Sequence, residues 1–273
     1  MSLEIQTDKD FTDSYNYNFF VLDKETEEEW VGKINKRLKD ICTKGNPDIY
    51  DLNERALLAF DLANLVSINL PETKQVGIDS ISNRSILEKI NKAEFYNFRN
   101  IILTRYVRGV VISKLKDEST IPLSGVVPLF VFDSWIGNLD KKEDDYILDT
   151  KNKLWSIDYQ LWGPRDPEAK KVLGFCAEVY DFTEQNIVKQ LTRTAKLRDL
   201  LKNLNDSEEL EEGIRKIENI SDKSIENVVK KYNFCGTQEN SKNNLNATLT
   251  NFLIESRDQV GSKVRNVLQS IKQ

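Results

Sequence analysis

The order of strand-like and helix-like patterns limits the folds open to this chain of 273 residues. Short runs rich in β-branched and aromatic residues come first, and from about residue 168 apolar residues recur three and four positions apart, as in helices. Strands and helices do not alternate, so a parallel doubly wound sheet is disfavoured. The order predicts an α+β protein with two lobes, a small β-rich one with one helix and a larger, mostly helical one.

The first lobe is expected to span residues 1–107. The polar stretch Asp23–Glu29 separates two strand-like runs, which indicates a hairpin. Asp51 and Glu54 fit a capping box at the start of a helix. Strands are expected at 17–22, 30–34 and 100–107, and helices at 51–66 and around 85–95.

The second lobe is expected to span residues 108–273. Residues 125–136 are apolar nearly all round, which predicts a buried helix with Pro128 in its first turn. Two short strands joined by the turn Asp-Thr-Lys-Asn should then form a second hairpin. These strands are expected at 146–148 and 154–158, and later helices at 188–204, 210–220, 225–232 and 249–268.

The composition excludes several classes of chemistry. The chain has no histidine, so catalytic triads with histidine and histidine-ligated metals are excluded. A net charge of −5 argues against nucleic-acid binding, and three isolated cysteines form no zinc or disulfide pattern. Without a signal-like start or a long apolar run, a cytoplasmic protein that does not bind membranes is expected. Catalysis would depend on carboxylates, lysines, hydroxyls or a metal with oxygen ligands.

A crowded charged segment follows the predicted buried helix. Asp145 precedes the first strand of the second hairpin, and Asp158 ends the second strand, so both should emerge at the same end. Asp140 lies in the loop that leads into that end. Three converging carboxylates suit a hard cation such as Mg²⁺, although the hairpin taken alone is better explained by solvated acids in a polar loop.

Two residues upstream of this segment become candidates for a functional site because of their order along the chain. Lys33 lies in a strand-like run, and Glu54 lies in the helix that follows. Individually, a surface strand lysine and a capping glutamate need no function. A strand lysine, a helical glutamate, Asp-x4-Asp and a further acid nevertheless follow the order of parts in a kinase.

At these residues the sequence resembles the HipA-like kinases and, more distantly, phosphatidylinositol kinases. FDSWIGNLDKKEDDYIL and LWSIDYQLWG are similar to that family's W-I-x-N-x-D-R-x-x-x-N and I-D-x-G-x-x-F patterns. NERALLAFDLANLVSINLPET is similar to its glutamate-bearing helix, and FLIESRDQVGSKV to its last helix. The resemblance runs from about Asn18 to Val264 and implies a protein kinase-like fold that uses ATP and Mg²⁺.

The resemblance implies a role for each candidate residue. Asp140 would contact the substrate hydroxyl, preceded by the matching Asn138. Lys33 would contact the ATP phosphates and Glu54 would be its ion-pair partner. Mg²⁺ would bind Asp158 and Asp145, Lys142 would help to neutralise the γ-phosphate, and backbone groups near Tyr106 and Val107 would meet adenine.

The chain departs from the family pattern at several positions. Asp145 stands where the family has asparagine, Lys141 where it has arginine, and Gln160 where it often has glycine. The turn Asp23–Glu29 is acidic and lacks glycine, which makes it a poor cover for phosphates.

These features predict a kinase that phosphorylates a protein serine or threonine, or itself. The alternative is a pseudokinase that serves as a nucleotide-binding or protein-interaction module. A lipid kinase is disfavoured, because no amphipathic stretch with a basic face is present.

Overall fold

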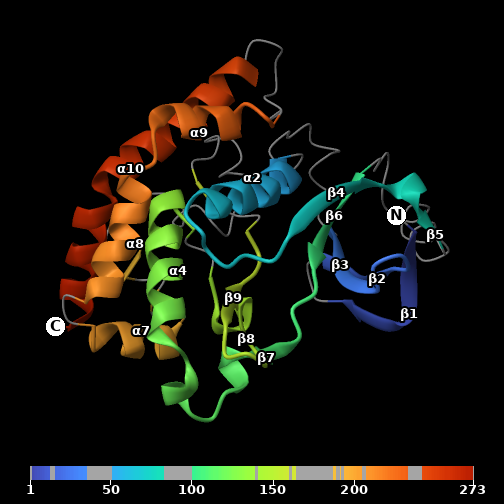
Figure 1. The fold of residues 1–273 in the computed structure, drawn as a ribbon, viewed down its shortest axis with the longest axis horizontal. Coiled ribbons are helices and arrows are strands. Elements are labelled where there is room, and N and C mark those ends of the chain that lie inside the picture. The colour runs from blue at the N-terminus through green and yellow to red at the C-terminus, as the bar shows by residue number, and fades with distance from the viewer. Residues whose placement is uncertain are drawn as a thin grey trace.

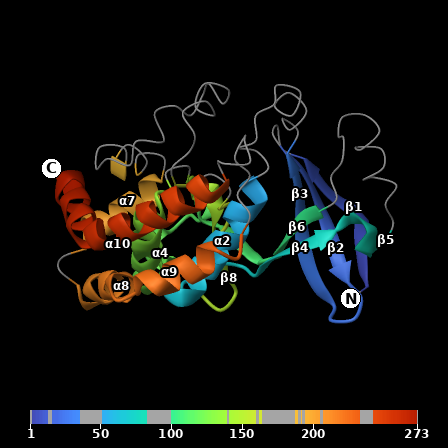
Figure 2. The same cartoon turned by 90° about the horizontal axis from the view of Figure 1, so that it is seen from above.

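A six-stranded sheet and a group of helices occupy opposite ends of the molecule (Figures 1 and 2). The structure is a computed structural model that describes residues 2–12, 16–35, 51–82, 100–138, 141–159, 162–163, 187–188, 191, 194–204, 207–232 and 242–272. Within these residues the protein is mixed α+β, as the order of sequence patterns predicts.

The first sheet contains both strands of the predicted N-terminal hairpin. Its strands are β1 (Leu3–Thr12), β2 (Asn16–Asp23), β3 (Glu28–Asn35), β4 (Thr73–Gly77), β5 (Ile81–Ser82) and β6 (Asn100–Arg105), in the order β4-β6-β3-β2-β1-β5. All neighbours are antiparallel except β1 and β5. The predicted strand at 100–107 is confirmed as β6. The sequence did not predict β1 and β4, whose charged and polar residues hide the alternation.

The two faces of this sheet carry different side chains. Phe19, Val21, Trp30 and Leu103 are buried on one face. Gly32 allows the Phe19 ring to cross β3, since a Cβ atom at Gly32 would lie 2.3 Å from that ring. Val31, Lys33, Ile102 and Thr104 lie on the opposite face and line the cavity described below.

A second, three-stranded sheet carries the other predicted hairpin. Its strands are β7 (Gly109–Val111), β8 (Tyr146–Asp149) and β9 (Leu154–Ser156), all antiparallel. Tyr146 pairs with Ser156, so the hairpin is confirmed, although β9 ends two residues before the predicted Asp158. Short 3-10 helices lie at Ile78–Ser80, Ile112–Lys114, Glu118–Thr120 and Glu143–Asp145.

Six α-helices lie within the described residues: α2 (Asp51–Leu65), α4 (Leu123–Ile136), α7 (Ala195–Lys202), α8 (Glu208–Glu218), α9 (Asp222–Val229) and α10 (Lys242–Lys272). They confirm helices at most of the predicted places, while the helix expected around 85–95 lies outside the described residues. Pro128 lies in the second turn of α4, not the first, because the helix starts at Leu123 with Pro122 as its N-cap. None of these helices is long and apolar enough to cross a membrane.

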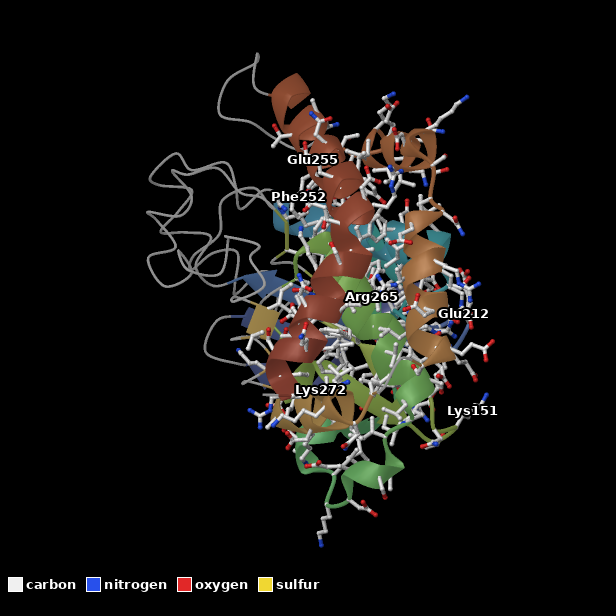
Figure 3. All side chains as sticks on the ribbon, turned by 90° about the vertical axis from the view of Figure 1, so that its left-hand side faces the viewer. Lys151, Glu212, Phe252, Glu255, Arg265 and Lys272 are labelled. Carbon is white, nitrogen blue, oxygen red and sulfur yellow. The ribbon has the colours of Figure 1, made fainter. Side chains whose placement is uncertain are left out.

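Helix α4 is the centre of the helical half. Its residues from Val126 to Ile136 are buried except Pro128. The Trp135 indole N–H donates to the Leu253 carbonyl at 2.9 Å, and the Ser256 hydroxyl donates to the Trp135 carbonyl at 2.6 Å. These bonds fix the C-terminal end of α4 to α10, which lies beside α8 (Figure 3). The contacts with α10 therefore fix the position at which the loop after α4 begins.

Helix α2 lies between the first sheet and the other helices (Figure 2). Leu58, Leu62 and Val66 at its end belong to the same hydrophobic core as α4 and α10. The sequence placed α2 in the first lobe, but its apolar residues pack with the helical half. It therefore connects the two halves rather than belonging to the sheet alone.

Candidate functional site

A cavity of about 440 Å³ lies between the first sheet and the second hairpin. One wall is the open face of the first sheet, where Lys33 is in register with Asn18 and Ile102. The other wall is the end of the second hairpin, with Asp145 and Asp158. A cavity of this size accommodates a nucleotide-sized ligand, and its two walls come from the two halves of the chain.

Lys33 and Asp158 form an ion pair across the cavity. Lys33 Nζ lies 3.3 Å from Asp158 Oδ1. The Asp158 side chain is 40 % exposed, because it opens into the cavity. The Lys33 ammonium lowers the pKa of Asp158, although burial opposes this. Asp158 is therefore ionised near neutral pH and available to bind a cation.

Asp145 lies at the same end of the hairpin as Asp158, as the predicted hairpin geometry requires. Its carbonyl accepts a hydrogen bond from the Ile157 N–H at 2.8 Å. Its Oδ2 accepts from the Lys142 N–H at 2.8 Å, which fixes the carboxylate at the edge of the cavity. Burial, together with the Asp158 charge, raises the pKa of Asp145 to about 6, although the Lys141 ammonium opposes this. Two carboxylates close to one another suit a divalent cation.

The raised pKa of Asp145 makes stability depend on pH in a defined direction. Between the unfolded pKa of about 4 and the folded value, the native state binds more protons, so stability falls as pH rises. We expect Asp145→Asn, which keeps an acceptor for the Lys142 N–H, to raise the melting temperature of the ligand-free protein at about pH 7.5. The gain should shrink as pH falls and be absent below about pH 3, where Asp145 is protonated in both the folded and the unfolded wild type.

Asp149 in the same hairpin provides the control for this measurement. Burial acts to raise its pKa, but hydrogen bonds from the Trp155 indole and from two backbone N–H groups outweigh burial and lower it. Asp149→Asn should therefore lower the melting temperature at about pH 7.5. A destabilised Asp145→Asn variant at that pH would contradict the assigned environment of Asp145.

Glu54 does not pair with Lys33 in this structure. Among the described residues its Oε2 is buried without a hydrogen-bond partner, and burial raises its pKa. The neighbouring Arg55 fixes the start of α2 to the segment at Trp162. Its guanidinium donates to the Trp162 carbonyl, and the Trp162 indole N–H donates to the Arg55 carbonyl at 2.9 Å. Lys33 is instead directed to Asp158.

Tyr106 and Val107 line the cavity just beyond the end of β6. The Tyr106 N–H already donates to the Glu29 carbonyl at 2.8 Å, so it is not available to a ligand. The same contact places the Asp23–Glu29 turn beside Tyr106, at the far end of β3 from Lys33. The acidic, glycine-free sequence of this turn, predicted to make it a poor cover for phosphates, therefore lies away from Lys33. The hairpin end near Lys33 is the β1–β2 end, because Asn16 pairs with Asn35.

The loop after α4 carries the remaining predicted residues. Gly137 ends the helix in a left-handed conformation, with φ of 73°. Asn138 is buried and its amide donates to Asp133 Oδ1 at 3.1 Å. Lys142 is exposed, and its charge contributes to the lowered pKa of Asp158. Asp140 lies outside the described residues, so its predicted role stays a prediction.

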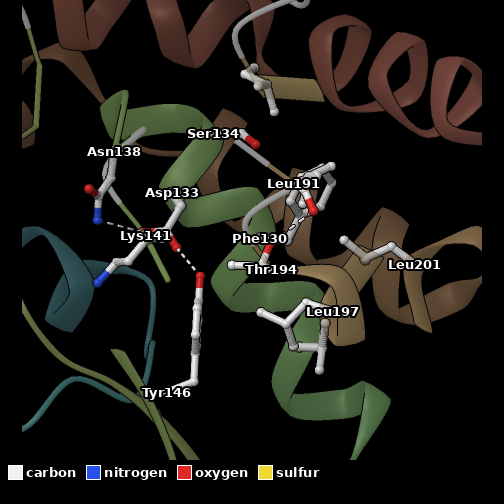
Figure 4. Close-up of a pocket in the computed structure, with 12 residues that line it drawn as sticks. Phe130, Asp133, Ser134, Asn138, Lys141, Tyr146, Leu191, Thr194, Leu197 and Leu201 are labelled. Atoms are coloured by element: carbon white, nitrogen blue, oxygen red, sulfur yellow. Dashed lines mark hydrogen bonds between the residues drawn. The ribbon is translucent and has the colours of Figure 1, made fainter. Parts of the chain in front are cut away.

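A buried polar group beneath this loop was not predicted from the sequence (Figure 4). Asp133 accepts hydrogen bonds from Asn138 and from the Tyr146 hydroxyl, each at 3.1 Å, beside a small cavity of about 40 Å³. Lys141 is close enough to act on its charge and is itself 2 % exposed. The signal that could have revealed this group is an aspartate within the apolar stretch LFVFDSWI, because a buried acid requires partners.

The site thus joins a lysine from the first sheet to two acids from the second hairpin, around a cavity with an apolar end. Such a site can hold a phosphate-bearing ligand and a divalent cation together. No protein-family model matches the sequence, and no curated protein is significantly similar to it.

Proposed function

We propose that this protein is an ATP- and Mg²⁺-dependent phosphotransferase with a two-lobed, protein kinase-like fold resembling the HipA-like kinases. The observation that carries the proposal is the Lys33–Asp158 ion pair beside Asp145, at the polar end of a nucleotide-sized cavity. The lobes are residues 1–107 and 108–273, with α2 docked on the second. A cavity lined by residues of both the first sheet and the second hairpin supports the proposal.

Lys33, Asp145 and Asp158 at the polar end of the cavity would together bind the phosphates and Mg²⁺. Lys33, which is now paired with Asp158, would bind the α- and β-phosphates of ATP. Asp158 and the free oxygen of Asp145 are the carboxylates that fit Mg²⁺, a cation that prefers oxygen ligands. Bound Mg²⁺ would neutralise charge on the phosphates. Lys33 would add its own positive charge to the stabilisation of the same phosphates.

The loop after α4 acts on the substrate. Asp140 accepts the proton of the attacking hydroxyl, and Lys142 neutralises charge that develops on the γ-phosphate. At the other end of the cavity, the Val107 N–H remains as the backbone donor for adenine, since the Tyr106 N–H is already bonded to Glu29. The acceptor is a serine or threonine hydroxyl of a protein, or of this protein itself.

A thermal-shift experiment tests the binding half of the proposal. We expect a non-hydrolysable ATP analogue with Mg²⁺ to raise the melting temperature, because a ligand at about 100 times its dissociation constant stabilises by about 2.7 kcal/mol. The analogue with excess chelator should give a smaller shift, because Asp145 and Asp158 then repel the phosphates. Equal melting temperatures with and without nucleotide would contradict the proposal.

A pseudokinase is the second candidate, and the state of Glu54 favours it. A kinase lysine normally pairs with its helical glutamate in the active state. Here Lys33 pairs with Asp158, and Glu54 Oε2 has no hydrogen-bond partner among the described residues. Nucleotide-dependent stabilisation without any transfer of labelled phosphate, to the protein itself or to protein substrates, would identify a pseudokinase.

A further inference from the structure

Lys141 is a buried cation that binds backbone carbonyl groups. Its side chain is among the largest fully buried ones, with 2 % of the residue exposed. Its ammonium donates to the Ile157 carbonyl and, at 3.3 Å, to the Asp158 carbonyl. It also lies 3.6 Å from the centre of the Tyr159 ring. The cation therefore holds two consecutive peptide units of the segment after β9.

That segment has an uncommon backbone conformation. Asp158 has φ of 65°, in the left-handed region that side-chain-bearing residues rarely adopt. Such a conformation persists only where surrounding contacts hold it. In this conformation the Asp158 carboxylate faces Lys33 across the cavity. The two carbonyls bound by Lys141 flank the turn that produces this direction.

The burial of Lys141 is compensated by Asp133. Each charge offsets part of the effect of burial on the other: burial lowers the pKa of Lys141 and raises that of Asp133, and their mutual attraction opposes both shifts. Asp133 is further held by Asn138 and Tyr146 (Figure 4). Buried charged groups contribute little net stability compared with apolar residues of similar volume. A role in stability therefore does not explain why a lysine is buried here, whereas its hydrogen bonds to the carbonyls of the Asp158 turn do.

We propose that Lys141 is a positioning residue that holds the backbone turn at Asp158 and so directs the Asp158 carboxylate into the cavity. It does not touch the ligand; it acts through Asp158. The consequence for metal binding rests on the proposed function, whereas the consequence for the conformation of Asp158 does not.

Lys196 provides a matched control. Its ammonium also binds backbone carbonyls, those of Ile112, Ser113 and Leu115, at 2.9, 3.1 and 2.6 Å. These carbonyls belong to the segment after β7 and not to the Asp158 turn. Lys141→Met and Lys196→Met each remove one ammonium from a set of carbonyls. Both variants lose stability, but only the first should change the site.

The direct test is a crystal structure of each variant without ligand. In Lys141→Met we expect residue 158 to leave the left-handed region and Lys33 Nζ to separate from the Asp158 carboxylate by more than about 4 Å, the limit for an ion pair. In Lys196→Met both features should persist. An unchanged φ and an unbroken ion pair in Lys141→Met would overturn the inference, whether or not the protein binds nucleotide.

Binding of Mn²⁺ in the presence of a non-hydrolysable ATP analogue, followed by electron paramagnetic resonance, measures the consequence. Affinity should fall about tenfold or more in Lys141→Met, as when a residue that orients a metal ligand is removed. It should be unchanged in Lys196→Met and largely restored in Lys141→Arg, which keeps a cation. Equal losses in the two methionine variants would show a merely structural role and overturn the inference.

A double variant keeps the test possible if Lys141→Met does not fold. Asp133→Asn with Lys141→Met removes the uncompensated buried carboxylate and leaves two neutral side chains. It should fold and show the same displaced Asp158 and weakened Mn²⁺ binding; wild-type values would overturn the inference. If the wild type itself binds no Mn²⁺ with nucleotide, the proposed function fails, and the crystal structures alone decide the role of Lys141.

Discussion

Replacing Asp140 with Asn is expected to lower the rate of phosphate transfer by roughly 10²–10⁴-fold, the usual contribution of a general base. An amide cannot accept the proton of the attacking hydroxyl, although it fills the same volume. Nucleotide binding should stay close to wild type, because Lys33, Asp145 and Asp158 hold the phosphates and the metal. The measurement is incorporation of γ-labelled phosphate into the protein itself and into protein substrates.

The thermal shift of the same Asp140→Asn variant with nucleotide and Mg²⁺ is its control. A normal shift with lost transfer separates a role in chemistry from a role in binding or folding. Transfer at the wild-type rate in this variant would remove Asp140 from the mechanism.

Asp158→Asn should weaken Mg²⁺-dependent nucleotide binding by at least about 100-fold. A carboxylate and a divalent cation attract one another by several kcal/mol even at an effective dielectric constant of about 20, and each 1.4 kcal/mol is about tenfold in affinity. The change also releases Lys33 from its ion pair at 3.3 Å. Binding of nucleotide without metal should therefore persist or improve. Titration calorimetry with and without Mg²⁺ measures both effects.

Asp149→Asn is the matched control for this change. Asp149 lies at the turn end of the same hairpin and does not line the cavity that holds Asp158, and the substitution removes the same charge. It should leave Mg²⁺-dependent binding unchanged, even if it lowers stability. Similar losses in the two variants would mean that the hairpin matters only for folding.

The parts of the structure that depend on local patterns were predictable from the sequence. The second hairpin is an example, because two short apolar runs around a turn leave one pairing, and this pairing brings Asp145 and Asp158 to one end. The apolar stretch that becomes α4 is another, since a helix that is apolar all round must be buried. The position of the two acids follows from the second hairpin, and the mixed α+β class follows from the order of strand-like and helical patterns.

The parts that depend on long-range packing were not predictable. The Asp23–Glu29 turn joins the expected strands, but only their register with β6 shows that it lies near Tyr106 and away from Lys33. Lys141 lies in a run of charged residues that suggests solvent, and its burial follows from Asp133 and from the Asp158 turn. Sequence spacing contains no information about such contacts between distant segments.

A crystal structure with a non-hydrolysable ATP analogue and Mg²⁺ tests the central claim most directly. We expect the phosphates beside Lys33, with one metal ion bound by oxygens of both Asp145 and Asp158 at about 2.1 Å. A nucleotide bound outside this cavity, or a metal ion that contacts neither acid, would contradict it.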